Sequence, residues 1–177
     1  MKPYKNPQNQ SGAILIMTLI ILLIITVLGA SSVQVTSLLE KMARNATDTS
    51  VAFRAAEAAI IEAERIVEDE TALTAYQANT GGKYEVQAVG VIPRWTDDAT
   101  WDGVNSVEVD YSDGAAKPQY IIEFEKSVLS DEDRLNMDNV GGETGAARTQ
   151  MFRVTALGIG KTESAKVVLQ STYGKKF

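Results

Sequence analysis

The sequence predicts an α+β protein in which one long N-terminal helix crosses a membrane with its first half and packs on an antiparallel β-sheet with its second half. Three observations predict this fold class: an uncharged apolar run over residues 13–30, apolar residues at helical spacing over residues 52–67, and alternating β-rich segments toward the C-terminus. The apolar run is long enough to cross a hydrocarbon core at about 1.5 Å per residue. The amphipathic helix and the alternating strands are each apolar on one face, and these faces are expected to pack together in the core of a domain outside the membrane.

The apolar run, AILIMTLIILLIITVLGA, contains no charged residue, and the first acidic residue after it is Glu40. It is preceded by Lys2 and Lys5, with no acidic residue among residues 1–12. Positive charge before an apolar run places the N-terminus in the cytoplasm and the rest of the chain outside. We therefore expect a single membrane-spanning helix half over residues 13–35. Removal of the whole run as a secretory signal fits less well, because it is longer than a typical h-region and no A-x-A site follows.

The composition limits the classes of function. Of the 177 residues, about 145 follow the apolar run, enough for one domain with its own core. The net charge of −6 becomes −8 when Lys2 and Lys5 are removed, which argues against nucleic acid as a partner. The sequence has no Cys and no His. It therefore has no disulfide and lacks the commonest general base and the commonest metal ligand.

The helix is expected to continue beyond the membrane segment, because no Gly or Pro occurs in residues 31–78. Its amphipathic part extends over about residues 36–68. Apolar residues recur there at steps of three and four and form one apolar face: Ala52, Ala56, Ala59, Ile60, Ala63 and Val67. We predict one helix from about Ala13 to between Ile66 and Glu70, with its apolar face packed on a sheet. Helix propensity is lowest at residues 29–32, where the helix is expected to be softer.

The remaining sequence is expected to form strands joined by turn-rich segments. Strands are predicted at residues 83–92, 104–111, 120–125, 151–157 and 164–171. Gly81 and Gly82 precede the first strand, and Pro93 stops it. Residues 158–161 are expected to turn between the last two strands and to give an antiparallel hairpin. The polar, Gly-rich residues 130–147 are predicted to form a loop.

Few residue patterns suggest chemistry. An acidic segment resembles a calcium loop and contains Asp131, Asp133, Asn136, Asp138 and Asn139. Leu135 occupies the third ligand position, however, and Gly is absent from the sixth, so we predict a solvated loop and no metal. The acidic pairs at residues 97–98 and 110–113 are interpreted as turns. No S-x-x-K, G-x-S-x-G or phosphate-loop motif occurs, and we predict no enzyme site and no cofactor.

The two tryptophans, Trp95 and Trp101, lie in the turn-rich middle of the chain. Two indole rings six residues apart can form a platform for a sugar. Large aromatic side chains more often pack in a core or anchor a loop. We therefore predict that both residues pack in a core or anchor a loop, and do not form a sugar platform.

Gly12 stands between the polar leader and the apolar run. This order resembles the class III signal sequences of type IV pilins. The resemblance implies that a prepilin peptidase removes the leader, residues 1–12, by cutting after Gly12. It also implies methylation of the new N-terminal amine at Ala13, and a hydrophobic helix that stays in the mature protein.

Two longer segments carry a more specific resemblance. Residues 38–64, LLEKMARNATDTSVAFRAAEAAIIEAE, are similar to the N-terminal region of PilX-like minor pilins. Residues 152–173, FRVTALGIGKTESAKVVLQSTY, resemble the C-terminal motif of the same proteins, most characteristically over residues 168–173. The resemblance implies a pilin fold with a periplasmic globular domain over residues 36–177. The middle of the chain carries no matched motif.

The chain departs from the pilin pattern at Met17, the fifth residue after the implied cut. Most pilins have Glu there, and that carboxylate is thought to meet the N-terminal amine of a neighbouring subunit. An unpaired amine inside an apolar bundle costs several kcal/mol, and Met17 cannot neutralise it. The resemblance with minor pilins located at the tip, some of which also lack the acid, implies a subunit that starts or caps a filament. The alternative is variation at this position without consequence.

The resemblance implies a structural minor pilin and no enzyme. It implies residence in the inner membrane and then in the cell-surface pilus, with prepilin peptidase, other minor pilins and the major pilin as partners, and no nucleic acid bound by this subunit alone. Pilus assembly, twitching motility and cell adhesion are the functions it implies. A type II secretion pseudopilin is an alternative within the class. A periplasmic enzyme or binding protein tethered by an uncut signal anchor is the alternative from another class.

Overall fold

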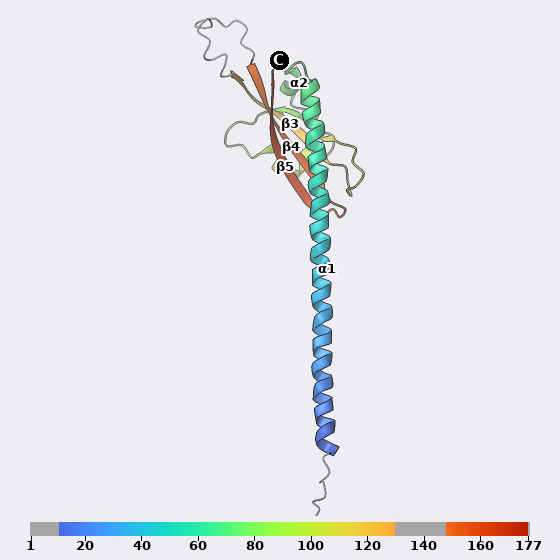
Figure 1. The fold of residues 1–177 in the computed structure, drawn as a ribbon. Coiled ribbons are helices and arrows are strands. Elements are labelled where there is room, and N and C mark those ends of the chain that lie inside the picture. Colours follow the sequence, from blue (N-terminus) through green and yellow to red (C-terminus); the bar gives the residue numbers. More distant parts are fainter. Residues whose placement is uncertain (1–10, 130–147, 177) are drawn as a thin grey trace, which may run out of the picture. The chain divides into compact units, whose positions relative to one another are not determined.

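The computed structural model describes residues 11–129 and 148–176. Its helices are α1 (Ser11–Asp69), α2 (Thr74–Gln77) and the 3₁₀ helices η1 (Arg94–Thr96) and η2 (Asp98–Trp101). Its strands are β1 (Lys83–Glu85), β2 (Val107–Glu108), β3 (Gln119–Leu129), β4 (Arg148–Ile159) and β5 (Lys166–Lys176). Figure 1 labels the three long strands, β3, β4 and β5. The chain divides into two compact units, one ending at Arg44 and the other beginning at Asn45.

Helix α1 is one continuous α-helix of 59 residues, which confirms the predicted long helix. It begins two residues before the predicted start and ends inside the predicted range. It also runs unbroken through residues 29–32, where a softer point was expected. There the hydroxyls of Ser31 and Ser32 donate to the carbonyls of Val27 and Leu28, at 2.9 and 3.0 Å. These bonds satisfy the polar side chains within the helix itself.

The strands form one sheet in the order β1-β3-β4-β5, with β2 also paired to β3. The pairs β3–β4 and β4–β5 are antiparallel along their whole lengths, which confirms the α+β class and the terminal hairpin. The sheet is mixed rather than purely antiparallel, however, because β1 runs parallel to β3. A parallel neighbour needs a crossover connection, and residues 86–118 supply it between β1 and β3.

Two predicted strands are much shorter than expected. The strand predicted over residues 83–92 ends at Glu85, although the Val86 amide still donates to the Phe124 carbonyl at 3.0 Å. Beyond it the chain leaves the sheet, and Gly90 has a φ of 93°, which an extended strand does not allow. The strand predicted over residues 104–111 retains only Val107 and Glu108.

The hairpin turn also lies later than predicted. Gly158 belongs to β4, and the turn is closed by a hydrogen bond of 2.8 Å from the Gly160 amide to the Ala165 carbonyl. A Cβ added to Gly158 would lie 2.5 Å from the backbone nitrogen of Ala56 and closer still to the Ala52 carbonyl oxygen. Gly158 is therefore a point of close packing between α1 and the sheet, and its role is not that of a turn residue.

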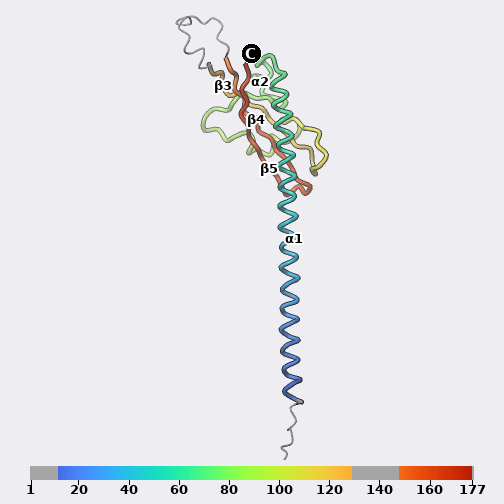
Figure 2. Tube along the Cα trace, in the orientation of Figure 1, coloured from blue at the N-terminus to red at the C-terminus, as the bar shows by residue number. Residues whose placement is uncertain are grey.

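The core lies between the sheet and residues 51–67 of α1, the part of the helix that Figures 1 and 2 show running along the sheet. The buried face of the helix consists of Val51, Ala52, Ala55, Ala56, Ala59, Ala63 and Val67. The sheet contributes Tyr120, Ile122, Phe152, Val154 and Ala156. Phe152 contacts the rings of Tyr76 and Phe124, with centroids 5.1 and 5.7 Å away. This confirms the predicted packing of the Ala-rich face on the sheet.

Candidate functional site

The residues implied in processing lie in the first turn of α1. Gly12 and Ala13 are exposed, and a Cβ on Gly12 would meet nothing within 4 Å. The first amide groups of a helix have no carbonyl partner within the helix, so the backbone at this junction is held by few hydrogen bonds. Met17 lies one turn further on, on the same side as Ala13, and is 67% exposed. Cutting after Gly12 stays a prediction from the sequence.

The residues that follow present apolar side chains on every side of the helix. The large apolar side chains between Ile14 and Val35 are between 48% and 71% exposed. The hydroxyls of Thr18 and Thr26 donate to carbonyls three residues earlier, at 2.9 and 2.7 Å, so they add no unsatisfied polar group. The helix is long and apolar enough to cross a membrane, and no part of its most apolar 18-residue segment is buried. An apolar surface of this kind is consistent with anchoring in the inner membrane.

In the globular unit, Asp48 ties α1 to the turn between β4 and β5. Its carboxylate accepts hydrogen bonds from the amides of Lys161 and Thr162, at 2.5 and 3.1 Å, and from the Thr162 hydroxyl. The hydroxyl contact is the main cause that lowers the pKa of Asp48 below its ordinary value of 3.8. Asp113 adds exposed ion pairs to Lys161 and Arg54, at 3.6 and 4.0 Å, and such pairs contribute little.

The other end of this helix segment is held by β5. The Lys175 ammonium donates to the carbonyls of Val67, Glu68 and Glu70, at 3.2 Å to the first and 2.6 Å to the last. These carbonyls lie at the C-terminus of the helix, where a cation is favourable. The hydroxyls of Ser171 and Tyr173 donate to the carboxylates of Glu64 and Glu68, at 2.9 and 2.7 Å. The bond to the Glu68 carboxylate raises the pKa of Tyr173.

Replacing Asp48 by Asn is expected to lower the midpoint of thermal unfolding at neutral pH, because the charged acceptor of the turn is lost. The folded pKa is lowered, so the contribution of the carboxylate is complete above the unfolded pKa near 3.8 and is lost as the pH falls through the folded pKa. The deficit of the variant should therefore shrink below about pH 3.8. Circular dichroism melts at several pH values measure this. Asp69→Asn is the control, because this exposed side chain pairs with Arg65 alone among the described residues. Equal effects of both variants would contradict the role of Asp48.

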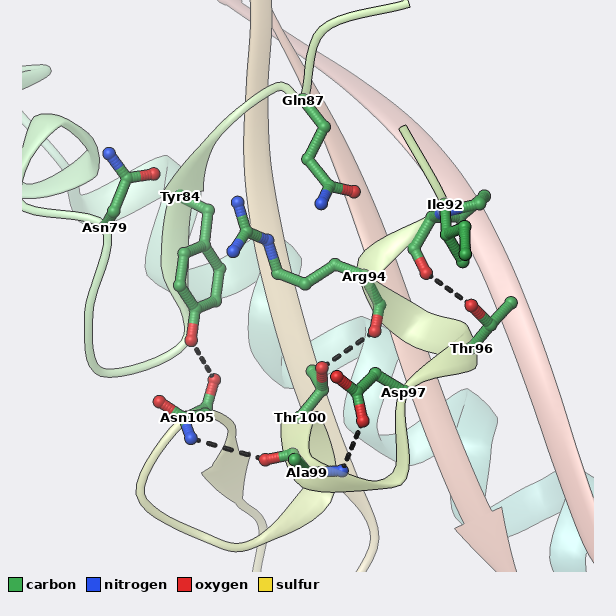
Figure 3. Close-up of a pocket in the computed structure, with 11 residues that line it drawn as sticks. Asn79, Tyr84, Gln87, Ile92, Arg94, Thr96, Asp97, Ala99, Thr100 and Asn105 are labelled. Carbon is green, nitrogen blue, oxygen red and sulfur yellow. Dashed lines mark hydrogen bonds between the residues drawn. The ribbon is translucent and has the colours of Figure 1, made fainter. Parts of the chain in front are cut away.

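A cavity of about 610 Å³ lies beside η1 and η2, as Figure 3 shows. Its wall includes Tyr84, Gln87, Arg94 and Asn105. The Thr100 hydroxyl donates a hydrogen bond to the Arg94 carbonyl at 2.7 Å, and the Tyr84 hydroxyl donates to the Asn105 carbonyl at 2.6 Å. The segments that surround the cavity are thereby tied to one another. No pattern in the sequence indicated this cavity, because its walls come from separate turn-rich segments.

The tryptophans lie in the same two 3₁₀ helices. The Trp101 indole donates to the Trp95 carbonyl at 3.1 Å, so Trp101 anchors this loop as predicted. Trp95 is 37% exposed, and neither side chain belongs to the core cluster between α1 and the sheet. The predicted acidic loop, with Asp131, Asp133, Asn136, Asp138 and Asn139, lies outside the described residues. Within residues 11–129 and 148–176, no group of three or more side chains that could hold a metal is found.

The comparisons with known proteins agree with the fold. The family described as "Type IV pilus assembly protein PilX C-term" matches residues 69–175, and the family described as "PilX N-terminal" matches residues 11–60. No curated protein and no solved structure matches the chain. The two family matches cover both the long helix and the strands that pack on it. The chain therefore belongs to the PilX family of type IV pilus assembly proteins.

Proposed function

We propose that this protein is a minor pilin that helps to start or cap a type IV pilus. One observation carries the proposal: α1 has two halves of different character. Residues 13–35 are apolar and exposed all round, whereas residues 51–67 bury one face in the globular core. A single helix of this kind serves both as an anchor and as part of a folded domain.

The apolar half is suited to two environments. Before assembly it lies in the inner membrane, and afterwards it packs among the apolar helices of other pilins. The exchange is feasible because the backbone groups of a helix are satisfied internally and both environments are apolar. The proposed partners are prepilin peptidase, the major pilin and other minor pilins, and the proposed final location is the cell-surface pilus. Pilus assembly, twitching motility and adhesion are proposed from the family, which is structural rather than enzymatic.

Gly12→Val is expected to block removal of the leader, residues 1–12, and entry into filaments. Membrane insertion should be unchanged, because Lys2, Lys5 and the apolar run are untouched. Intact-mass measurement of the protein, with and without prepilin peptidase, checks the cut and the methylation of Ala13. Gly29→Val is a matched control, since a Cβ at either glycine meets nothing within 4 Å. A Gly12→Val protein that still loses its leader and reaches sheared pili would contradict the proposal, as would an uncut wild-type protein.

The apolar side chain of Met17 supports a position of this subunit at the end of the filament. At that position no earlier subunit presents an amine to this helix, so a carboxylate at residue 17 would have nothing to neutralise. Met17→Glu should then bring no gain in assembly. It also places a carboxylate in lipid, at a cost of roughly 2–4 kcal/mol at the bilayer centre and less near the interface. Because residue 17 lies about one turn from Ala13, the cost is at the low end and the protein should still insert.

We expect both the wild-type protein and the Met17→Glu protein to be scarce in pili and enriched near one end. Immunogold labelling of sheared filaments measures both its amount and its position. Met17→Leu, which keeps an apolar side chain, controls for the change of shape. Labelling along the whole shaft, at a level that rises in Met17→Glu, would identify an ordinary shaft subunit and refute the position at the end.

A further inference from the structure

The cavity beside η1 and η2 contains a cationic side chain whose hydrogen-bonding groups are not used. The Arg94 guanidinium makes no hydrogen bond to any other described residue, and its buried Nε has no hydrogen-bond partner among them. This Nε lies 3.6 Å from Oε1 of Glu123, which is an ion pair without a hydrogen bond. A guanidinium carries five N–H donors in a planar fork, so Arg94 retains unused donors at the cavity.

The Arg94 guanidinium is held in position by the ring of Tyr84. Its central carbon lies 4.0 Å from the centroid of the Tyr84 ring, and Tyr84 is buried and fixed through its hydroxyl. The Arg94 side chain is 26% exposed, whereas the Glu123 side chain is only 4% exposed. Figure 3 shows the guanidinium directed toward Tyr84, Gln87 and Asn79, and away from Asp97. The planar fork is therefore pre-oriented, with part of its surface open to the cavity.

A second unused polar group faces the same space. The side-chain amide of Gln87 is half-buried, lines the cavity and forms no hydrogen bond with another described residue. The nearby carboxylates are already engaged: that of Asp97 accepts from the Ala99 amide at 3.0 Å, and that of Asp102 accepts from the Asn105 amide at 2.7 Å. The unused groups at this cavity thus combine a guanidinium fork with an amide, a combination suited to a planar oxygen acid.

We propose that this cavity binds a small monocarboxylate of the size of a sugar acid or an acylated amino acid. A carboxylate matches the guanidinium fork with two parallel hydrogen bonds, and the Gln87 amide can donate to one of its oxygens. A volume of about 610 Å³ lies within the range typical of small-molecule sites. Glu123 and Asp97 favour a single negative charge over a double one, because each further charge on the ligand adds repulsion. This inference does not depend on the proposed role in the pilus.

The positions of the tryptophans allow a direct test. The chain has two tryptophans, and both lie in the 3₁₀ helices beside the cavity, so its tryptophan fluorescence reports on this region. The full chain in detergent micelles is titrated at constant ionic strength with sodium galacturonate and with sodium N-acetylglycinate. The neutral counterparts, galactose and N-acetylglycinamide, are titrated in parallel. Inorganic phosphate tests for a general anion site.

We expect a saturable change in fluorescence with at least one carboxylate and none with its neutral counterpart. The comparison of galacturonate with N-acetylglycinate distinguishes a sugar acid from a peptide-like carboxylate. A response to the neutral counterparts, or binding of phosphate as tight as that of the carboxylates, would overturn the proposal. The absence of any saturable response to both carboxylates would overturn it too.

Variants identify the groups responsible. Arg94→Gln should weaken carboxylate binding by about tenfold or more, the usual effect of losing a charge-assisted hydrogen bond. Arg94→Lys should restore only part of the affinity, because an ammonium lacks the fork. Gln87→Ala should weaken binding by several-fold and, having no internal hydrogen bond to lose, should leave the melt unchanged, so it tests the site even where an Arg94 variant does not fold. Arg65→Gln, on the exposed side of α1, is the matched control, and equal effects of Arg65→Gln and Arg94→Gln would overturn the assignment.

Discussion

Gly158→Ala is expected to lower the free energy of unfolding of the globular unit by about 3 kcal/mol, near the upper end of typical overpacking costs. The added Cβ would lie 2.5 Å from the Ala56 nitrogen and 2.9 Å from the Ala56 Cβ, so its neighbours are a helix backbone and a short side chain. Neither can rotate away, and relief requires α1 to move off β4. Gly158→Val should therefore abolish cooperative unfolding.

Gly174→Ala is the matched control for Gly158→Ala, because it also adds one methyl group to a glycine in the same hairpin. Its added Cβ would lie 3.2 Å from the Met151 sulfur and the Thr149 methyl, and these side-chain ends can shift. Urea unfolding of the full chain in detergent, followed by circular dichroism, measures both variants. A Gly158→Ala midpoint equal to that of Gly174→Ala would show that α1 and β4 are not in close contact there.

A shortened chain that begins at Arg65 is expected to lose its folded structure, whereas one that begins at Asn45 is expected to fold. The shorter chain lacks the buried Ala52 and Ala56, which pack against Gly158. It also lacks Ala59 and Ala63, which belong to one core cluster with Ile122, Val154 and Ala156. Removing these residues uncovers the sheet face that they pack against, and a typical domain has a net stability of only about 5–15 kcal/mol to lose. The compact unit that begins at Asn45 retains the whole face.

Thermal melts and the dispersion of amide resonances in NMR spectra distinguish the two shortened chains. The chain from Asn45 should give one cooperative transition without detergent, because it also lacks the exposed apolar residues 13–39. The chain from Arg65 should give none. A cooperative melt of the chain from Arg65 would show that the helix is not part of the core.

Much of the fold could be predicted because it follows local patterns. The long helix followed from the absence of Gly and Pro and from the spacing of Ala52, Ala56 and Ala63, all of which are buried. The central strands followed from alternation, and β3 and β4 contain the segments predicted at residues 120–125 and 151–157. In each case neighbouring residues along the chain share one face, so the sequence pattern and the burial pattern coincide.

The predictions were wrong where pairing partners decide the outcome. The predicted strand alternates Tyr84, Val86 and Ala88 and is rich in β-branched residues. After Val86, however, the chain makes no further backbone pairing with β3 among the described residues. Gly158 reads as a turn residue in the sequence, and it lies within β4 because only a residue without a side chain fits against Ala52 and Ala56. Strand propensity depends on such surroundings more than helix propensity does.

The amino-acid sequence alone identified the membrane-spanning segment, the long helix with its buried face, the terminal hairpin and the resemblance to PilX, since each rests on residues close together in the chain. The tertiary structure decided which distant residues meet. It placed Asp48 on the turn at Thr162, 114 residues away, and Lys175 on the end of α1. It also left the Arg94 guanidinium open to a cavity made by separate segments. Contacts between residues so far apart depend on how the elements pack together, which no spacing along one segment specifies.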